Sequence, residues 1–198
     1  MLEQRIQQQF FESADLKYQS AEVLSRPIAD AVGALVGCIT AGGKVLVCGG
    51  GRSAGAAQQL AADLVGRFER ERPGLAAVAL STDGAVLAAL AEGSEYAAVF
   101  AQQVHALGQP GDVLVAISAT GDSPVVLGAV DAARVKDMTV VALTGRGGGA
   151  LAKRLSDTDV NVCVPHDRVS RIREVHQLVL HCLCDAVDLQ LLGEQDSA

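Results

Sequence analysis

The stretch Lys44-Val45-Leu46-Val47-Cys48-Gly49-Gly50-Gly51-Arg52-Ser53-Ala54-Gly55 decides the fold. Its first half is a short apolar run of the kind that a central parallel strand needs, and three glycines then allow a tight turn. Ser53 stands where the next helix should begin. Because a helix N-terminus offers free N–H donors and partial positive charge, the stretch predicts a phosphate-binding loop.

The same stretch also matches a dinucleotide-binding loop. Gly49, Gly51 and Ala54 fit the fingerprint Gly-x-Gly-x-x-Ala. Asp83, just beyond the next expected strand, stands where the ribose-binding acid of such a site would be. One match of this type is a weak signal, so the rest of the chain must decide between the two sites.

Composition limits the classes of protein to which the chain can belong. Its 198 residues fit one α/β domain over 1–198, and 49% of them are hydrophobic, enough for a sizeable core. The formal net charge of −7 and the aromatic content of 3% argue against direct binding of nucleic acid. No signal peptide and no long, strongly apolar run is apparent, so we expect no membrane span. The odd number of cysteines, five, indicates reduced thiols and a cytoplasmic protein.

Strand-like and helix-like segments alternate along the chain. We expect strands near 45–48, 75–80, 112–118, 138–144 and 159–164, with helices between them and a last helix over 170–192. This alternation predicts a doubly wound parallel sheet with helices on both faces. Two extra helices, over 3–25 and over 27–40 with Pro27 at the start of the second, should precede a core that spans 42–198.

A second polar loop follows the third expected strand. Ser118, Thr120 and Ser123 present three hydroxyls around Gly121, just before a helix that begins at Pro124. Ligands of doubly wound sheets bind beyond the carboxyl ends of the strands, so this loop and the first one should meet around one phosphate. The alternative is that these hydroxyls only cap the helix. A P-loop is excluded because the chain has no Gly-x-x-x-x-Gly-Lys-Ser/Thr.

The chain resembles the sugar isomerase (SIS) domain family, in the branch that contains bacterial phosphoheptose isomerase and DiaA, the protein that associates with the replication initiator DnaA. The resemblance covers nearly the whole chain, and the segments Glu71–Leu75, Leu80–Asp83 and Cys182–Asp185 look most like DiaA. It implies a flavodoxin-like sheet, a phosphosugar site and a homotetramer assembled through the N-terminal helices over 1–41. The residues that it implies for substrate binding are Gly50, Gly51, Ser53, Asp83, Ser118, Thr120, Ser123 and Arg173.

The resemblance also implies an acid–base pair. Asp63 stands at the position of the family's catalytic glutamate, and His181 matches a family histidine on the last helix. Gln59 and Arg173 replace a histidine and a glutamine that, with these two, can hold a metal, often zinc. Only Asp63 and His181 remain as good zinc ligands, fewer than the three of a typical catalytic site. We therefore predict no metal site, with zinc at Asp63 and His181 as the alternative. Asp122 replaces an asparagine of the second loop, and it either points toward the phosphate or caps a helix.

Two functions follow from the resemblance. The first is a DiaA-like cytoplasmic tetramer that binds a DnaA-type initiator and regulates chromosome replication, without touching DNA itself. The alternative is an isomerase that converts sedoheptulose 7-phosphate for the synthesis of lipopolysaccharide heptose. For the first, Leu191 and Leu192 near the end of the last helix are the expected partner surface, unless they close the core of their own subunit.

Overall fold

Five strands form one parallel sheet in the computed structural model, which describes residues 1–93 and 95–194. The strands are β1 (Val45–Gly49), β2 (Ala77–Ala79), β3 (Val113–Ile117), β4 (Thr139–Gly145) and β5 (Val160–Val164). The residues of β1 and β3 are buried throughout. Each overlaps one of the five expected segments, which confirms the predicted parallel α/β sheet. The strand order β2-β1-β3-β4-β5 is the flavodoxin-like order that the resemblance implied.

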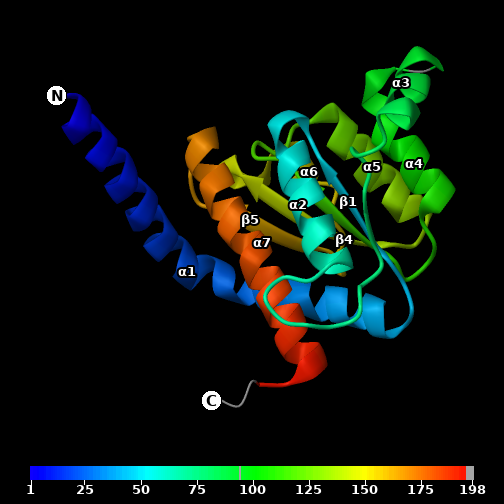
Figure 1. Cartoon of the computed structure of the whole chain (residues 1–198). Coiled ribbons are helices and arrows are strands. Elements are labelled where there is room, and N and C mark those ends of the chain that lie inside the picture. Colours follow the sequence, from blue (N-terminus) through cyan, green and yellow to red (C-terminus); the bar gives the residue numbers. More distant parts are fainter. Residues whose placement is uncertain (94, 195–198) are drawn as a thin grey trace.

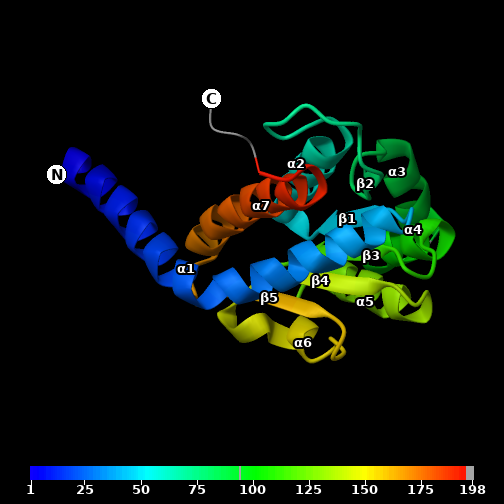
Figure 2. The same cartoon turned by 90° about the horizontal axis from the view of Figure 1, so that it is seen from below.

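The helices lie on both faces of this sheet (Figure 1). Within the described residues they are α1 (Leu2–Thr40), α2 (Ala54–Val65), α3 (Gly84–Gly93), α4 (Val99–Leu107), α5 (Pro124–Val135), α6 (Gly149–Ala152) and α7 (Val169–Leu192). Figure 2 shows α2 and α7 on one side of the strands and α5 and α6 on the other. Because side chains alternate along a strand, Val45 and Val47 pack with α1, α2 and α7, whereas Leu46 and Cys48 pack with α4 and α5.

The N-terminal segment differs from the prediction in one respect. The two expected helices are one continuous helix of 39 residues, with Pro27 inside it. A proline removes one hydrogen bond and bends a helix, and Figures 1 and 2 show α1 changing direction along its length. Leu24 before the proline and Ala31 after it are buried in the same core cluster, so packing on both sides keeps the helix continuous.

The first part of α1, residues 2–15, extends away from the sheet (Figure 1) and is called the α1 arm below. It carries four exposed large apolar side chains, those of Leu2, Ile6, Phe10 and Phe11. By length and composition alone, α1 and α7 are two helices that could cross a membrane. Core helices of soluble proteins meet the same criteria, and α1 and α7 pack against each other on one face of the sheet.

Candidate functional site

The loops after β1 and β3 lie against each other. They leave the two central strands at the point where the strand order reverses, which is where doubly wound folds bind ligands. The N–H of Gly50 donates to the carbonyl of Ile117, at 3.1 Å. A Cβ atom on Gly50 would overlap the hydroxyl of Ser123, so only glycine allows the two loops to approach this closely. The structure therefore brings Gly50 of the first loop against Ser123 of the second.

The serine hydroxyls of this site are not used as helix caps. Ser53 precedes α2 and Ser123 precedes α5, yet neither side chain makes a capping hydrogen bond. Ser53 and Ser118 are each only 3% exposed. Within residues 1–93 and 95–194, the hydroxyls of Ser53, Ser118 and Ser123 donate to no protein group, whereas Thr120 accepts a long bond of 3.4 Å from the N–H of Asp122. These hydroxyls thus have no donor role among the described residues, and their binding of a phosphate stays a prediction.

The second loop is braced from behind by the turn after β4. A Cβ atom on Gly121, whose φ is +73°, would overlap the carbonyl of Gly148, and the N–H of Leu151 donates to the carbonyl of Gly121 at 2.9 Å. The carboxylate of Asp122 accepts the N–H of Ala150 at 2.8 Å. Asp122 thus binds the start of α6 rather than the helix that follows its own loop, and its effect on a bound phosphate stays a prediction.

Asp83 also has a structural role at the same edge of the sheet. It is exposed, and its Oδ1 accepts the N–H groups of Ala85 and Val86, at 2.9 and 3.0 Å, at the start of α3. These bonds occupy one carboxylate oxygen. Binding of sugar hydroxyls by Asp83 remains a prediction.

Asp63 and His181 lie on neighbouring helices, α2 and α7, which descend side by side from the carboxyl edge of the sheet (Figures 1 and 2). Both oxygens of the Asp63 carboxylate accept the amide of Gln59, at 2.9 Å. Nε2 of His181 lies 3.0 Å from the amide nitrogen of Gln177, and its ring lies 5.6 Å from that of Phe68. Each side chain thus has one hydrogen-bond partner within its own helix. Both are half-buried and therefore still accessible to solvent.

A buried histidine that the sequence did not single out links α7 to the sheet. Nε2 of His176 lies 2.9 Å from the carbonyl of Thr144, at the end of β4, and its Nδ1 has no partner in the described part of the chain. Burial, with a smaller contribution from the nearby charge of Arg173, lowers the pKa of His176 to about 4. His176 is thus neutral at pH 7, and its contact with Thr144 ties α7 to the end of β4.

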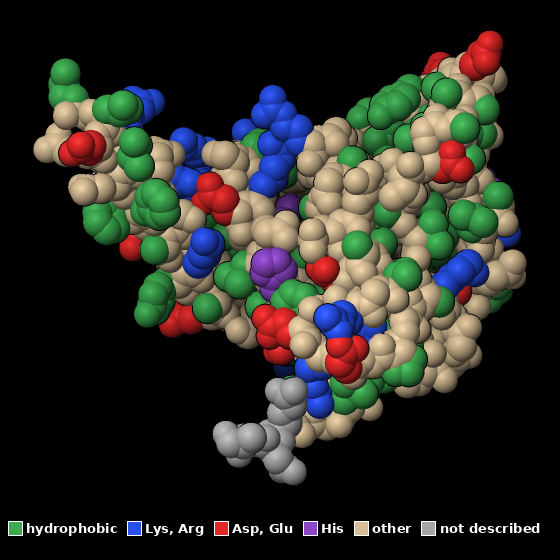
Figure 3. Space-filling model, in the orientation of Figure 1, with side chains coloured by type: hydrophobic (Ala, Val, Ile, Leu, Met, Phe, Trp, Pro, Cys, Tyr) green, Lys and Arg blue, Asp and Glu red, His purple; other side chains and the backbone are tan. Residues whose placement is uncertain are grey.

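Basic side chains gather around the start of α7 on the face shown in Figure 3. Arg168 and Arg171 are paired with Glu12 of the α1 arm, and Arg171 also with Glu174. Arg173 is half-buried and makes no ion pair with any described residue. Because Glu12 and Glu174 offset the charges of Arg168 and Arg171, Arg173 carries the charge that would favour the approach of an anionic ligand.

The residues present do not fit a zinc site. Across 1–93 and 95–194, no three His, Cys, Asp or Glu side chains lie close enough together to hold a metal ion. Asp63 and His181 supply at most two ligands, and the position that could add a third carries Arg173, a cation.

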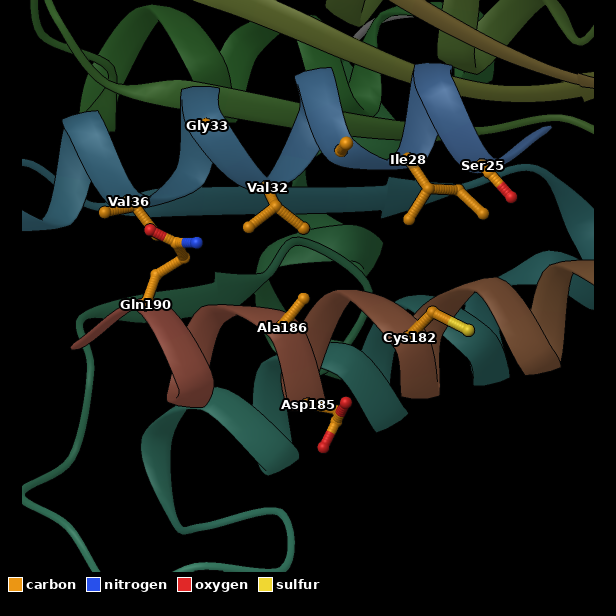
Figure 4. Close-up of a pocket in the computed structure, with 10 residues that line it drawn as sticks. Ser25, Ile28, Val32, Gly33, Val36, Cys182, Asp185, Ala186 and Gln190 are labelled. Atoms are coloured by element: carbon orange, nitrogen blue, oxygen red, sulfur yellow. The ribbon is translucent and has the colours of Figure 1, made fainter. Parts of the chain in front are cut away.

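A groove of about 580 Å³ runs between α1 and α7, away from the two loops (Figure 4). Ile28 and Val32 face Ala186 and Cys182 across it, and no residue predicted to bind substrate lines it. Near the end of α7, Leu191 packs against the core cluster, whereas Leu192 is 41% exposed. Of the two residues predicted to contact a partner, Leu191 thus belongs to the core of the subunit, and Leu192 lies at the surface.

Comparisons with known proteins cover nearly the whole chain. The SIS domain family model matches residues 9–145. A phosphoheptose isomerase of Methylibium petroleiphilum is 67% identical over 196 residues, 99% of this chain and 98% of that protein. The structure of a phosphoheptose isomerase from Neisseria gonorrhoeae has a TM-score of 0.90 at 44% identity, covering 95% of this chain and 99% of that one. The structure of a phosphoheptose isomerase from Francisella tularensis has a TM-score of 0.92 at 41% identity, covering 95% of this chain and 98% of that one.

These comparisons agree with the motifs on which the sequence resemblance rested. They favour the phosphate-loop interpretation of Gly49–Ser53 over the dinucleotide one. Both the sequence identity and the structural overlap extend over almost the full length of the chain. The chain therefore belongs to the SIS domain family, in the branch that contains the bacterial phosphoheptose isomerases.

Proposed function

We propose that this protein is a phosphosugar isomerase that acts on sedoheptulose 7-phosphate or a closely similar ketose phosphate. The observation that carries the proposal is the meeting of two loops whose serine hydroxyls cap no helix. Hydroxyls and N–H groups at the starts of α2 and α5 would bind the phosphate with neutral donors. The names of the relatives supply the reaction type.

The acid–base pair lies at a depth that suits a long substrate. Asp63 is ten residues beyond Ser53, which at about 1.5 Å per residue is roughly 15 Å along α2. If the phosphate is held at the loops, the opposite end of an extended sugar chain would lie near Asp63. Asp63 would take the proton from C1 of the ketose and return it to C2, while His181 would protonate the C2 oxygen and accept the proton of the C1 hydroxyl.

The order of the two functions inferred from sequence is reversed by the comparisons. The relatives described above are named phosphoheptose isomerase, which favours the isomerase alternative and gives the DiaA-like interpretation no support. A DnaA-type partner, and its contact at Leu191 and Leu192, therefore remain sequence-based predictions without support. The carboxylate of Asp63 is one methylene shorter than the family's glutamate, so we expect slow turnover rather than full family activity.

The test is direct isomerisation of sedoheptulose 7-phosphate, followed as formation of the aldose, in buffer with a chelator and in buffer with added zinc. We expect slow turnover under both conditions, and a loss of about 100-fold or more in Asp63→Asn and in His181→Gln. Asp185→Asn is the matched control, because Asp185 is an exposed carboxylate of α7 that lines the separate groove. Turnover that survives in Asp63→Asn would exclude this assignment of the base.

A further inference from the structure

A buried ion pair links the segment that follows α2 to helix α7. Nε of Arg72, in the segment between α2 and β2, donates to Oδ1 of Asp188, on the last turns of α7, at 2.5 Å. Both side chains are only 1% exposed, although Glu71, Pro73 and Gly74 around Arg72 are exposed. An arginine in a surface segment is thus turned inward to meet a carboxylate 116 residues further along the chain.

The same guanidinium also holds the end of α2. Its Nη2 donates to the carbonyl of Asp63 at 2.9 Å, and its Nη1 donates to the carbonyl of Leu64 at 2.8 Å. The last carbonyls of a helix have no partner within the helix. The bond from Nη2 pairs the carbonyl of Asp63, whereas the carbonyl of Leu64 also accepts the N–H of Leu75 at 2.9 Å. A cation at this end of α2 is also favoured by the helix dipole. One planar side chain therefore fixes the backbone of the candidate base relative to α7.

The segment that carries Arg72 also touches the candidate acid. The ring of Phe68 lies 5.6 Å from that of His181, at an angle of 33°. Arg72 holds the backbone of Asp63, and Phe68, four residues earlier, holds the imidazole of His181. The short segment 68–72 thus contacts both members of the proposed acid–base pair, and the Arg72–Asp188 pair anchors that segment.

Stability alone does not account for the pair. Two buried charges usually gain little over well-packed apolar side chains, because their desolvation offsets their attraction. Here Oδ2 of Asp188 lacks any hydrogen-bond partner in the described residues, so the pair is not even fully satisfied. What an apolar replacement cannot reproduce is the fork of donors that reaches α7 and two carbonyls of α2 at once.

We propose that Arg72 and Asp188 are positioning residues, which hold Asp63 and His181 in the relative placement that proton transfer requires. The proposal rests on the isomerase function proposed above. It assigns the pair no contact with substrate, and it predicts an effect on the chemical step rather than on phosphate binding, since the two loops lie at the other end of α2.

The test compares three variants with the native chain. Arg72→Lys keeps the charge but loses the fork. Arg72→Met combined with Asp188→Leu removes both charges while keeping apolar volume, so the core can remain packed. Arg70→Met is the matched control, because Arg70 lies in the same segment and also reaches the end of α7, through the carbonyl of Gly193 at 2.7 Å, with no hydrogen bond to α2 among the described residues.

We expect Arg72→Lys and the double variant to lower kcat for sedoheptulose 7-phosphate by about 10- to 100-fold while KM stays within about twofold, because small misplacements of reacting groups are costly. Arg70→Met should keep both constants within about twofold. Circular dichroism at the assay temperature establishes that each variant is folded. A folded double variant, or a folded Arg72→Lys, with native kcat would overturn the proposal.

A second readout does not depend on turnover. The ring-proton NMR shifts of His181, assigned with His181→Gln, report the neighbouring aromatic ring of Phe68, and Phe68→Leu gives the shift expected when that contact is lost. We expect the double variant to move the His181 shifts toward those of Phe68→Leu. If the native protein shows no isomerisation, the proposed function fails, and these shifts alone decide: native shifts in the double variant would then reject the positioning role.

Discussion

The two faces of the sheet are built from different kinds of side chain. On the face covered by α4 and α5, the buried helix residues are valines, alanines and one phenylalanine. On the face covered by α1, α2 and α7, the buried set also includes Arg171, His176 and Asp188. Asp63 and His181 lie on this second face as well. The first layer therefore contributes apolar packing alone. The second layer also buries polar and charged side chains, which lowers stability but fixes where these side chains lie.

The largest test of this difference is removal of Asp188. Asp188→Ala leaves Arg72 buried without its carboxylate, and breaking such a pair costs about 3–5 kcal/mol of the free energy of unfolding. Urea denaturation measures the loss. Asp185→Ala, three residues away but exposed, should change the same free energy by no more than about 0.5 kcal/mol. Equal effects of the two substitutions would mean that the buried charges on this face are not held as a pair.

The next test uses pH. Burial lowers the pKa of His176 to about 4, whereas the unfolded chain binds the proton near the ordinary value of 6.5. The unfolded state therefore binds more protons between these values, so the free energy of unfolding should fall as pH drops from 6.5 toward 4, by about 2–3 kcal/mol in total. His176→Gln should remove this part of the pH dependence. Parallel curves for the two proteins would show that His176 does not carry it.

A third test addresses the junction between the loops. Gly50→Ala places a methyl group against Ser123 and should force the two loops apart, which should lower affinity for inorganic phosphate by about 10-fold. Gly55→Ala is the control: no atom lies within 4 Å of its added Cβ, and it stands inside α2, where alanine is favoured over glycine by about 0.5–1 kcal/mol. Isothermal titration with phosphate separates the two variants. Equal affinities would argue against a phosphate site at this junction.

The smallest effect on the fold is expected at the α1 arm. The homotetramer implied by the resemblance remains a prediction, which we base on the exposed Leu2, Ile6, Phe10 and Phe11. Phe10→Ser with Phe11→Ser should reduce the molecular mass measured by light scattering while changing the unfolding free energy of the subunit by no more than about 0.5 kcal/mol. A native protein that is monomeric at micromolar concentration would contradict the predicted assembly. So would an unchanged mass in the double variant.

The sequence predicted those parts of the molecule that depend on local pattern. Apolar runs and glycines marked the five strands and the loop at Gly49–Ser53, because strand burial and tight turns leave their signature within a few residues. The break at Pro27 was wrong, since packing of Leu24 and Ala31 on one core outweighs the loss of a hydrogen bond. The Arg72–Asp188 pair was missed because nothing local shows that two residues so far apart in the chain will meet.

The contact between α1 and α7 has a consequence for synthesis. Helix α1 leaves the ribosome well before its partner α7, and it packs against α7 as well as against the sheet. Until α7 has emerged, the apolar stripe that includes Leu16 and Leu24 has only part of its cover. The nascent chain therefore exposes an apolar helix until α7 is synthesised. Contacts between segments so far apart in sequence also form slowly. Binding of a chaperone to ribosome-bound chains should be strongest before α7 is released.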